Sequence, residues 1–255
     1  MNDVNERLSS TEESCNIIDL NEDPSDLCVL PNGNFVMTQF NSTNDILSVY
    51  DKNFNFIERI HKLNDEYIHA FSIVTNELDR IYINNLDKII STDLEFNYLF
   101  EFNSKENQLN TLCYMLFNNE SLYICDCNDK CIIIFNSDLK LQTKRYLDIK
   151  PVQMQILNSV SCIVPNPDDP FLYFYDLINF TLKLKVDRCS NIIVHENKFF
   201  GINGTIIKVF DNRGNYEASK ELVQLEGCNV SNLPFIKIKN SKLFIHLYER
   251  KMLIL

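Results

Sequence analysis

Residues 121–136 have the sequence SLYICDCNDKCIIIFN, in which two apolar runs flank a short polar segment. The runs 121–125 and 131–135 are rich in Ile, Tyr and Phe, which favour β-strands, and their lengths suit strands. Asn128 and Asp129 between them are typical of a tight turn, because their side chains can hydrogen-bond the local backbone. The segment therefore predicts a strand, a turn and a second strand.

Partial copies of this pattern occur along the chain. The first copy covers 24–60, where the runs 24–30, 35–40, 46–50 and 54–60 are separated by polar segments. Between the first two runs lies Pro31-Asn32-Gly33-Asn34. Proline fixes one φ angle of a turn and glycine tolerates a positive one. We expect this part of the chain to form one four-stranded antiparallel sheet.

The turn between the third and fourth strands gives the period of the repeat. Its first polar position can be aligned in five copies, spaced 35 to 45 residues apart: Asp51, Ser91, Asn136, Asp176 and Asp211. Soon after each, we expect an apolar residue to begin the fourth strand: Phe54, Leu94, Leu139, Phe180 and Tyr216. Short strands repeated every forty or so residues are typical of a β-propeller, a ring of small sheets called blades.

Both ends of the chain contribute to the last predicted blade. The C-terminal part holds only three apolar runs, 235–238, 242–247 and 251–255. Residues 15–20 supply a fourth, and we expect this N-terminal strand to pair with the C-terminal blade, since closure of the ring removes open sheet edges. The sequence thus predicts an all-β, six-bladed β-propeller. Residues 15–255 would form its single domain, after a mobile polar tail at 1–14.

Two segments resemble the NHL repeat. One is 122–136, with Asp126 at the position of the family's strand-end aspartate, and the other is 27–36, LCVLPNGNFV. The segment 206–215 is similar in part, whereas the second, fourth and sixth copies are degenerate. Asn84 and Asn85 stand near the aspartate position of the second copy. The resemblance implies a six-bladed propeller. It implies no ubiquitin-ligase activity, because the RING and B-box segments of the metazoan ligases have no counterpart here.

The charge balance argues against two classes of partner. With 24 basic and 35 acidic residues, the net charge is −11. Nucleic acids and anionic membranes are bound through Lys and Arg, and no basic run occurs. We therefore expect neither as a partner. The first residues lack the basic start and apolar run of a secretion signal. We expect a cytoplasmic monomer whose nine cysteines are thiols.

One face of the predicted propeller is the candidate binding site. It is formed by the turns between second and third strands together with the connections between blades, and these segments are rich in Asp and Glu. We predict four binding residues on it: Asn128, Asp129, Asp168 and Asp169. The last two lie in the loop PNPDDP at 165–170, for which a stiff connector without a ligand is the other interpretation. The leading hypothesis is a non-catalytic module that binds proteins or peptides, with a preference for basic segments.

An enzyme is the alternative hypothesis. Six-bladed propellers also include lactonases and related hydrolases that hold a divalent cation in the central channel. A calcium-type site would need oxygen donors at the starts of the innermost strands, for which the candidates are Asp26, Asn110, Asn191 and Asn229. No local motif singles out these residues, so the leading hypothesis includes no catalytic residue, metal or cofactor.

Three cysteines lie close together in the segment 121–136. Cys125, Cys127 and Cys131 could suggest a zinc site, but structural zinc needs four ligands and no histidine or fourth cysteine lies nearby in sequence. We expect them to be small apolar side chains in a tightly packed sheet. The same expectation covers three cysteines in predicted innermost strands: Cys28, Cys113 and Cys189.

Overall fold

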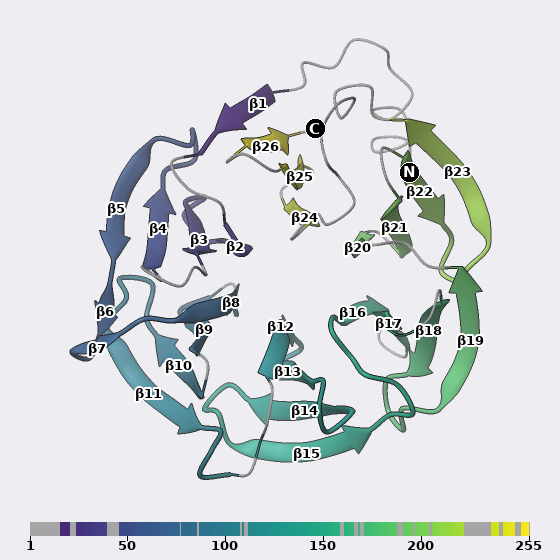
Figure 1. The fold of residues 1–255 in the computed structure, drawn as a ribbon, viewed down its shortest axis with the longest axis horizontal. Helices are drawn as coiled ribbons and strands as arrows, with labels where there is room; N and C mark the ends of the chain where they lie inside the picture. Colours follow the sequence, from purple (N-terminus) through teal and green to yellow (C-terminus); the bar gives the residue numbers. More distant parts are fainter. Residues whose placement is uncertain are drawn as a thin grey trace. The chain divides into compact units, whose positions relative to one another are not determined.

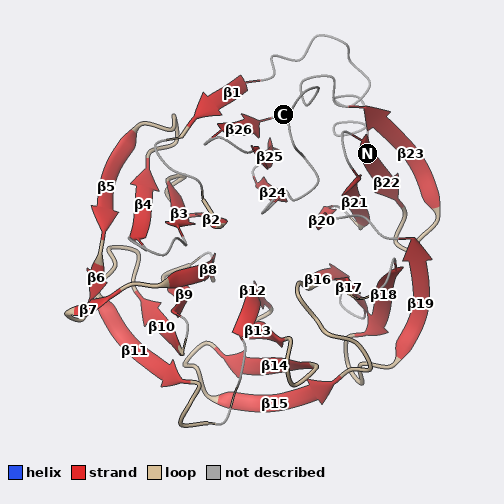
Figure 2. Cartoon of the chain, viewed as in Figure 1, coloured by secondary structure: helices blue, strands red, loops and turns tan. Residues whose placement is uncertain are grey.

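The computed structural model describes residues 16–20, 24–39, 46–76, 78–85, 87–107, 109, 112–158, 161–165, 168, 171–187, 191–195, 197–203, 206–221, 236–239, 242–247 and 251–254. Within these ranges the regular secondary structure is β-strand throughout (Figure 2). No helix of this part of the chain is long and apolar enough to cross a membrane. The strands form six four-stranded antiparallel sheets and one two-stranded sheet. The expectation of an all-β propeller is confirmed, and the predicted tail at 1–14 lies outside the described residues.

Pro24–Asp187 form one compact unit, which contains four blades. The blades are β2 (Asp26–Val29) to β5, β8 to β11, β12 to β15 and β16 to β19, each with its strands in chain order. In each blade of this unit the first strand is innermost and the fourth lies at the rim (Figure 1). The remaining strands of the unit are β3 (Phe35–Gln39), β4 (Ile46–Tyr50), β5 (Phe56–Ile60), β8 (Ala70–Thr75), β9 (Ile81–Asn85), β10 (Lys88–Thr92), β11 (Tyr98–Asn103), β12 (Leu112–Asn118), β13 (Ser121–Asp126), β14 (Cys131–Asn136), β15 (Leu141–Tyr146), β16 (Gln155–Asn158), β17 (Ser161–Pro165), β18 (Phe171–Asp176) and β19 (Leu182–Asp187), with the hairpin β6 (Lys62–Leu63) and β7 (Glu66–Tyr67) between the first two blades.

The second compact unit combines residues from both ends of the chain, 1–23 and 188–255. One of its sheets is β20 (Asn191–His195), β21 (Lys198–Asn203), β22 (Ile206–Phe210) and β23 (Tyr216–Glu221). The other has the order β1 (Asn16–Asp19), β26 (Lys251–Ile254), β25 (Lys242–Leu247) and β24 (Ile236–Lys239). Here β1 pairs antiparallel with β26, with Asn16 opposite Ile254 and Asp19 opposite Lys251. That residues 15–255 form a single domain stays a prediction.

The middle strands of the larger unit are buried on both faces, which explains their nearly continuous apolar sequence. Because side chains alternate along a strand, Ile124 and Cys131 pack with Tyr82 of the second blade, whereas Cys125 packs with Cys162 of the fourth. Apolar side chains thus fill the space between successive sheets. Burial of this kind supplies most of the stabilisation of the array, at roughly 25 cal/mol per Å² of apolar surface.

The turn between third and fourth strands is built alike in five blades. In each, a side-chain oxygen of the residue that ends the third strand or directly follows it accepts backbone N–H groups of the turn, at 2.8 Å and 2.9 Å for Asp51 with Asn53 and Asn55. Each turn also has one residue with positive φ: Phe54, Phe96, Leu139, Phe180 and Gly214. The recurring polar residue satisfies the turn's backbone and sets where the fourth strand begins.

This common turn corrects the alignment of the second blade. Ser91 and Thr92 are buried inside β10, and the turn begins at Asp93. The Oδ1 atom of Asp93 accepts the N–H groups of Glu95 and Asn97 at 3.0 Å and 2.8 Å. Three predicted starts of the fourth strand were also too early, since Phe54, Leu139 and Phe180 belong to the turns. Leu94 likewise lies in a turn, since Phe96 has positive φ and β11 begins at Tyr98, whereas Tyr216 is confirmed as the first residue of β23.

Candidate binding site

The turns between second and third strands and the connections between blades lie at the same end of the four blades of Pro24–Asp187. We call this end the loop face. Among its described segments are 61–69, 104–107, 127–130 and 147–154. Innermost strand β2 packs beside β8, and β8 packs beside β12, so the strand ends beneath this face are close neighbours.

Asp26 joins the first blade to the second just below the loop face. It is the first residue of β2, and its side chain is 4% exposed. Its Oδ2 atom accepts the Ser72 hydroxyl at 2.9 Å and the Ile73 N–H at 3.0 Å, both from β8. Its Oδ1 atom accepts the N–H of Leu27 at 2.8 Å. A buried carboxylate surrounded by donors in this way acts as a connector between sheets.

Amide side chains make the next connections. Asn84 of β9 is fully buried, and its Nδ2 donates to the carbonyl oxygens of Leu112 and Cys113 in β12, at 2.8 Å and 3.1 Å. Gln155 of β16 donates to the hydroxyl of Tyr114 in β12 at 2.9 Å. Polar side chains therefore link each blade of this unit to the next beneath the loop face. Asn84 stands near the degenerate aspartate position of the second copy, but the sequence pattern did not predict this contact.

The β13–β14 turn presents two of the predicted binding residues, and a buried aspartate shapes it. Asp126 is fully buried, and its Oδ1 accepts the backbone N–H groups of Asn128 and Asp129 at 3.2 Å and 3.1 Å. The turn ends at Lys130, whose φ of 51° lies in the left-handed region. Asn128 is exposed and Asp129 half-buried. Both polar side chains are thus held on one short turn, as the sequence predicted.

The other two predicted residues lie elsewhere. Asp168 is exposed in the β17–β18 connection of the fourth blade, where its carboxylate pairs with the Lys150 ammonium at 3.1 Å. Asp169 lies outside the described residues. The binding role of all four residues remains a prediction.

Lysines compensate part of the acidity of the loop face. Besides the Asp168 pair, Asp87 pairs with Lys105, and the Lys88 ammonium lies 2.8 Å from Glu66 and 3.0 Å from Glu101. Hydrogen bonds from Lys88 to Glu66 and Glu101 raise the pKa of the Lys88 ammonium. Exposed pairs of this kind add little stability, but they reduce the net negative potential of the face. The remaining acidic side chains include Asp65, Glu106 and Asp148.

Of the four calcium-type candidates, only Asp26 has a described side chain. The carboxylate of Asp26 accepts the hydrogen bonds described above. Asn110 and Asn229 lie outside the described residues, and Asn191 is described only as a backbone position at the start of β20 in the other unit. In the described part of the chain, no group of three or more His, Cys, Asp and Glu side chains is placed to hold a metal ion.

The cysteine segment divides between the two faces of its sheet. Cys125 and Cys131 are buried in different apolar clusters, as expected for small apolar side chains, and Cys28 is buried as well. Cys127 is different, because its Sγ atom lies 2.6 Å from the Sγ of Cys113 and 2.9 Å from the carbonyl oxygen of Pro151. Sequence spacing could not reveal this pair. The predicted innermost-strand residue Cys189 lies outside the described residues.

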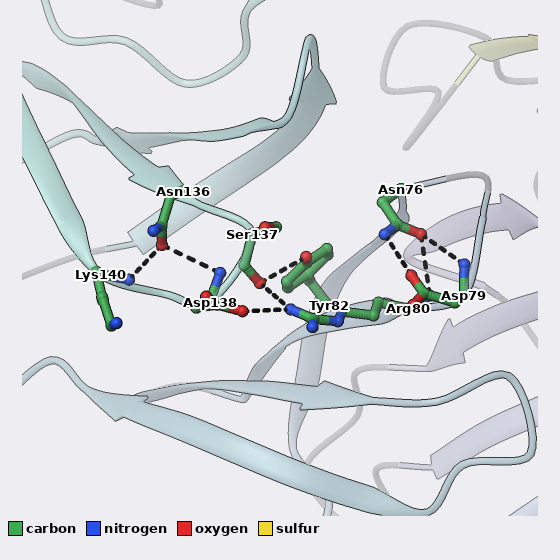
Figure 3. A network of polar contacts seen from close by, with 8 residues as sticks. All are labelled: Asn76, Asp79, Arg80, Tyr82, Asn136, Ser137, Asp138 and Lys140. Atoms are coloured by element: carbon green, nitrogen blue, oxygen red, sulfur yellow. Dashed lines mark hydrogen bonds and ion pairs between the residues drawn. The ribbon is translucent and has the colours of Figure 1, made fainter.

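The opposite face of the same unit holds a second polar connection between blades. Arg80 Nη1 donates to the carbonyl oxygen of Ser137 at 2.7 Å and to Asp138 Oδ1 at 2.8 Å (Figure 3). The hydroxyl of Tyr82 donates to the same carbonyl at 2.9 Å. The hydrogen bond with Asp138 raises the pKa of the Arg80 guanidinium. This network joins the β8–β9 turn to the β14–β15 turn, at the end of the blades opposite the loop face.

Solved structures show the same architecture. The chain is similar to virginiamycin B lyase from Staphylococcus aureus, with a TM-score of 0.69 at 9% identity over 94% of this chain and 98% of that one. It is also similar to a streptogramin B lyase, with a TM-score of 0.63 at 12% identity over 95% and 97%. The WD40 repeats of RRP9 have a TM-score of 0.65 at 6% identity over 90% and 78%.

At these identities the similarity concerns the fold alone, a β-propeller. No family model matches the chain. No curated protein matches it either. Enzymes and WD40 repeats share this fold, so function has to be argued from the residues of the site.

Proposed function

We propose that this protein is a non-catalytic binding propeller whose loop face takes a protein or peptide ligand with basic segments. The observation that carries the proposal is the β13–β14 turn. Buried Asp126 accepts the backbone N–H groups of Asn128 and Asp129, so the backbone that carries both polar side chains is held in place. Preorganised polar groups lose little conformational entropy when a ligand binds.

The charge of the loop face supports a basic partner. After the lysine pairs are taken into account, acidic side chains such as Asp65, Glu106 and Asp148 still contribute negative charge. Such charge steers basic ligands toward the face and repels phosphate. We therefore propose a protein or peptide partner, and neither nucleic acid nor a membrane, for a monomer working in the cytoplasm.

We further propose that the six sheets close into one ring of the NHL type, with β1 as the outermost strand of the last blade. The β1–β26 pairing supports this proposal. Its test is a variant that lacks residues 1–20, which would leave the edge of β26 open. We expect that variant to melt at a lower temperature and to self-associate, because an unpaired strand edge favours aggregation. An unchanged melting temperature would contradict the closure.

A peptide titration tests the binding proposal. The probes are a short fluorescent peptide rich in Lys and Arg and a peptide of equal length with Glu at those positions. We expect only the basic peptide to bind, with affinity that falls as salt increases. Replacement of Asp129 by Asn should weaken binding by about two- to fivefold, as for loss of one ion pair with the peptide. Glu58→Gln is the control, since Glu58 is exposed on the rim strand β5. Equal binding of both peptides, or equal effects of both variants, would overturn the proposal.

The alternative is a lactonase-like hydrolase with a calcium-type site in the central channel. The first two solved structures named above are lyases, and this is the reason for keeping an enzyme as the second candidate. A calcium titration distinguishes the candidates. A hydrolase of this type should melt at a higher temperature with calcium, because a ligand that binds only the folded state stabilises it. The binding propeller should show no change.

A further inference from the structure

Two thiols meet where the innermost strand of the third blade reaches the loop face. Cys113 lies in β12, and Cys127 is the first residue after β13. The ladder pairs Leu112 with Asp126, so the two cysteines flank one cross-strand pair, and a bulge between Leu112 and Met115 interrupts the register beside them. Their sulfur atoms lie 2.6 Å apart. Side chains at such diagonal positions of adjacent strands are within reach of each other.

These two thiols are also the accessible ones in the described part of the chain. Cys113 and Cys127 are half-buried, whereas the other four cysteines described there are buried: Cys28, Cys125, Cys131 and Cys162. Burial raises the pKa of the Cys131 and Cys162 thiols to about 11 and about 12, which keeps them protonated and unreactive. A small reagent in solution therefore meets the pair before it meets the core cysteines.

The hydrogen bonding of the pair distinguishes its members. The Cys127 thiol has two acceptors within reach, the Cys113 sulfur and the Pro151 carbonyl oxygen. A hydrogen bond from Cys127 lowers the pKa of the Cys113 thiol, and the same interaction raises the pKa of Cys127. The thiolate therefore forms first at Cys113, with Cys127 beside it as the protonated partner.

We propose that Cys113 and Cys127 form a redox-active dithiol whose oxidant is a low-molecular-weight disulfide. The Cys113 thiolate attacks one sulfur of the small disulfide, forms a mixed disulfide and releases one thiolate. The Cys127 thiol then loses its proton to water, and its sulfur attacks Cys113 and releases the second small thiolate. One protein disulfide forms, and the small disulfide is reduced to two thiols. No further oxidant is needed.

The Cys113–Cys127 bond would change the loop face. The turn 127–130 is now held through Asp126, and the disulfide would fix its first residue to β12 as well. Asn128 and Asp129 stand next to that residue. Oxidation is thus expected to alter the affinity of the loop face for its ligand, a consequence that rests on the proposed function. The oxidation itself does not rest on it.

Thiol mapping of the native full-length chain tests the dithiol. The chain is incubated with oxidised glutathione, alkylated, digested and examined by mass spectrometry. We expect a linked peptide pair that joins Cys113 to Cys127, with the buried cysteines alkylated only after unfolding. A chain that keeps both thiols, or one that links either cysteine to another residue at a comparable yield, would overturn the proposal.

Single substitutions assign the two roles. In Cys127→Ser the reaction should stop at a glutathione mixed disulfide on Cys113. In Cys113→Ser the partner that raises the pKa of Cys127 is absent, so Cys127 should form the glutathione mixed disulfide instead, and the reaction should again stop there. Cys131→Ser is the matched control and should form the disulfide normally. The same experiments in a background that carries Cys15→Ser, Cys189→Ser and Cys228→Ser exclude exchange with those cysteines. In the native chain a short pulse of iodoacetamide should label Cys113 before Cys127, because the Cys113 thiolate forms first, and equal labelling of the two would contradict the assignment.

Discussion

Replacement of Asp26 by Ala tests whether buried polar side chains hold neighbouring blades together. The change removes the acceptor for the Ser72 hydroxyl and the Ile73 N–H, which belong to β8. Both donors are buried between the first two blades, so the change leaves them without this acceptor in the interior. A buried donor that loses its acceptor costs about 1–3 kcal/mol, so the two donors from β8 alone give about 2–6 kcal/mol of lost stability.

Urea unfolding followed by far-UV circular dichroism or tyrosine fluorescence measures this loss. The chain has 11 tyrosines and no tryptophan, so tyrosine is the intrinsic fluorophore. Asp148→Ala is the matched control, because Asp148 is an exposed carboxylate on the loop face, and its effect should stay within about 0.5 kcal/mol. Asp26→Asn keeps one acceptor oxygen, so its loss of stability should fall between those of Asp26→Ala and Asp148→Ala.

A double-mutant cycle identifies the contact itself. Asp26 and Ser72 are hydrogen-bonded, so Asp26→Ala and Ser72→Ala should be non-additive by at least about 0.5 kcal/mol. A loss for Asp26→Ala no larger than that for Asp148→Ala, or additivity of the cycle, would show that this hydrogen bond does not hold the two blades together. Either result would mean that apolar packing alone holds these two blades together.

Three smaller perturbations follow from the turns and the ion pairs. Lys130→Gly should stabilise the chain by up to about 1 kcal/mol, because glycine relieves the positive φ, while Lys130→Ala should give no gain in the same urea titration. Arg80→Met should lower stability by about 1–2 kcal/mol through loss of its hydrogen bond to the Ser137 carbonyl, a larger effect than that of removing the exposed Asp138 carboxylate. The hydrogen bond from Lys183 lowers the pKa of Asp176 from 3.8, so its stabilisation is complete above pH 3.8 and is lost as pH falls through the lower folded-state pKa. The urea midpoint should therefore differ less between a pH above 3.8 and a pH below the folded-state pKa in Asp176→Asn than in the parent chain.

Strands were predictable from the sequence because burial on both faces leaves long apolar runs. The third strand of the first blade, 46–50, matches β4, and 242–247 matches β25. The error in the second blade has a physical cause. Ser91 and Thr92 are polar yet buried inside β10, so polarity alone marked the turn two residues too early. A better signal was the pairing of Asp93 with Asn97, which repeats the spacing of Asp51 with Asn55.

The candidate site was predictable only where its contacts are local. Asn128 and Asp129 lie within a few residues of Asp126, whose side chain determines their turn, and such short-range geometry follows from residue type. Asp26 and Ser72 are far apart in sequence, and their contact depends on how two sheets pack. The Cys113–Cys127 contact depends on the register of β12 against β13 and on the bulge beside Cys113. Neither the packing of two sheets nor this register follows from a short stretch of sequence.

Acidic residues in this protein have two physical roles that net charge does not separate. Asp26 and Asp126 are turned inward and accept backbone and hydroxyl donors, so they build the support of the loop face. Asp129 and Asp148 are more accessible and set the potential that a ligand meets. The two roles respond differently to substitution. Neutralising an inward carboxylate should weaken the folded state and leave the salt dependence of binding unchanged, whereas neutralising an accessible one should reduce that salt dependence at nearly constant stability. Measurements of stability and of salt dependence on the same variants would therefore separate the residues that hold the blades from those that attract the partner.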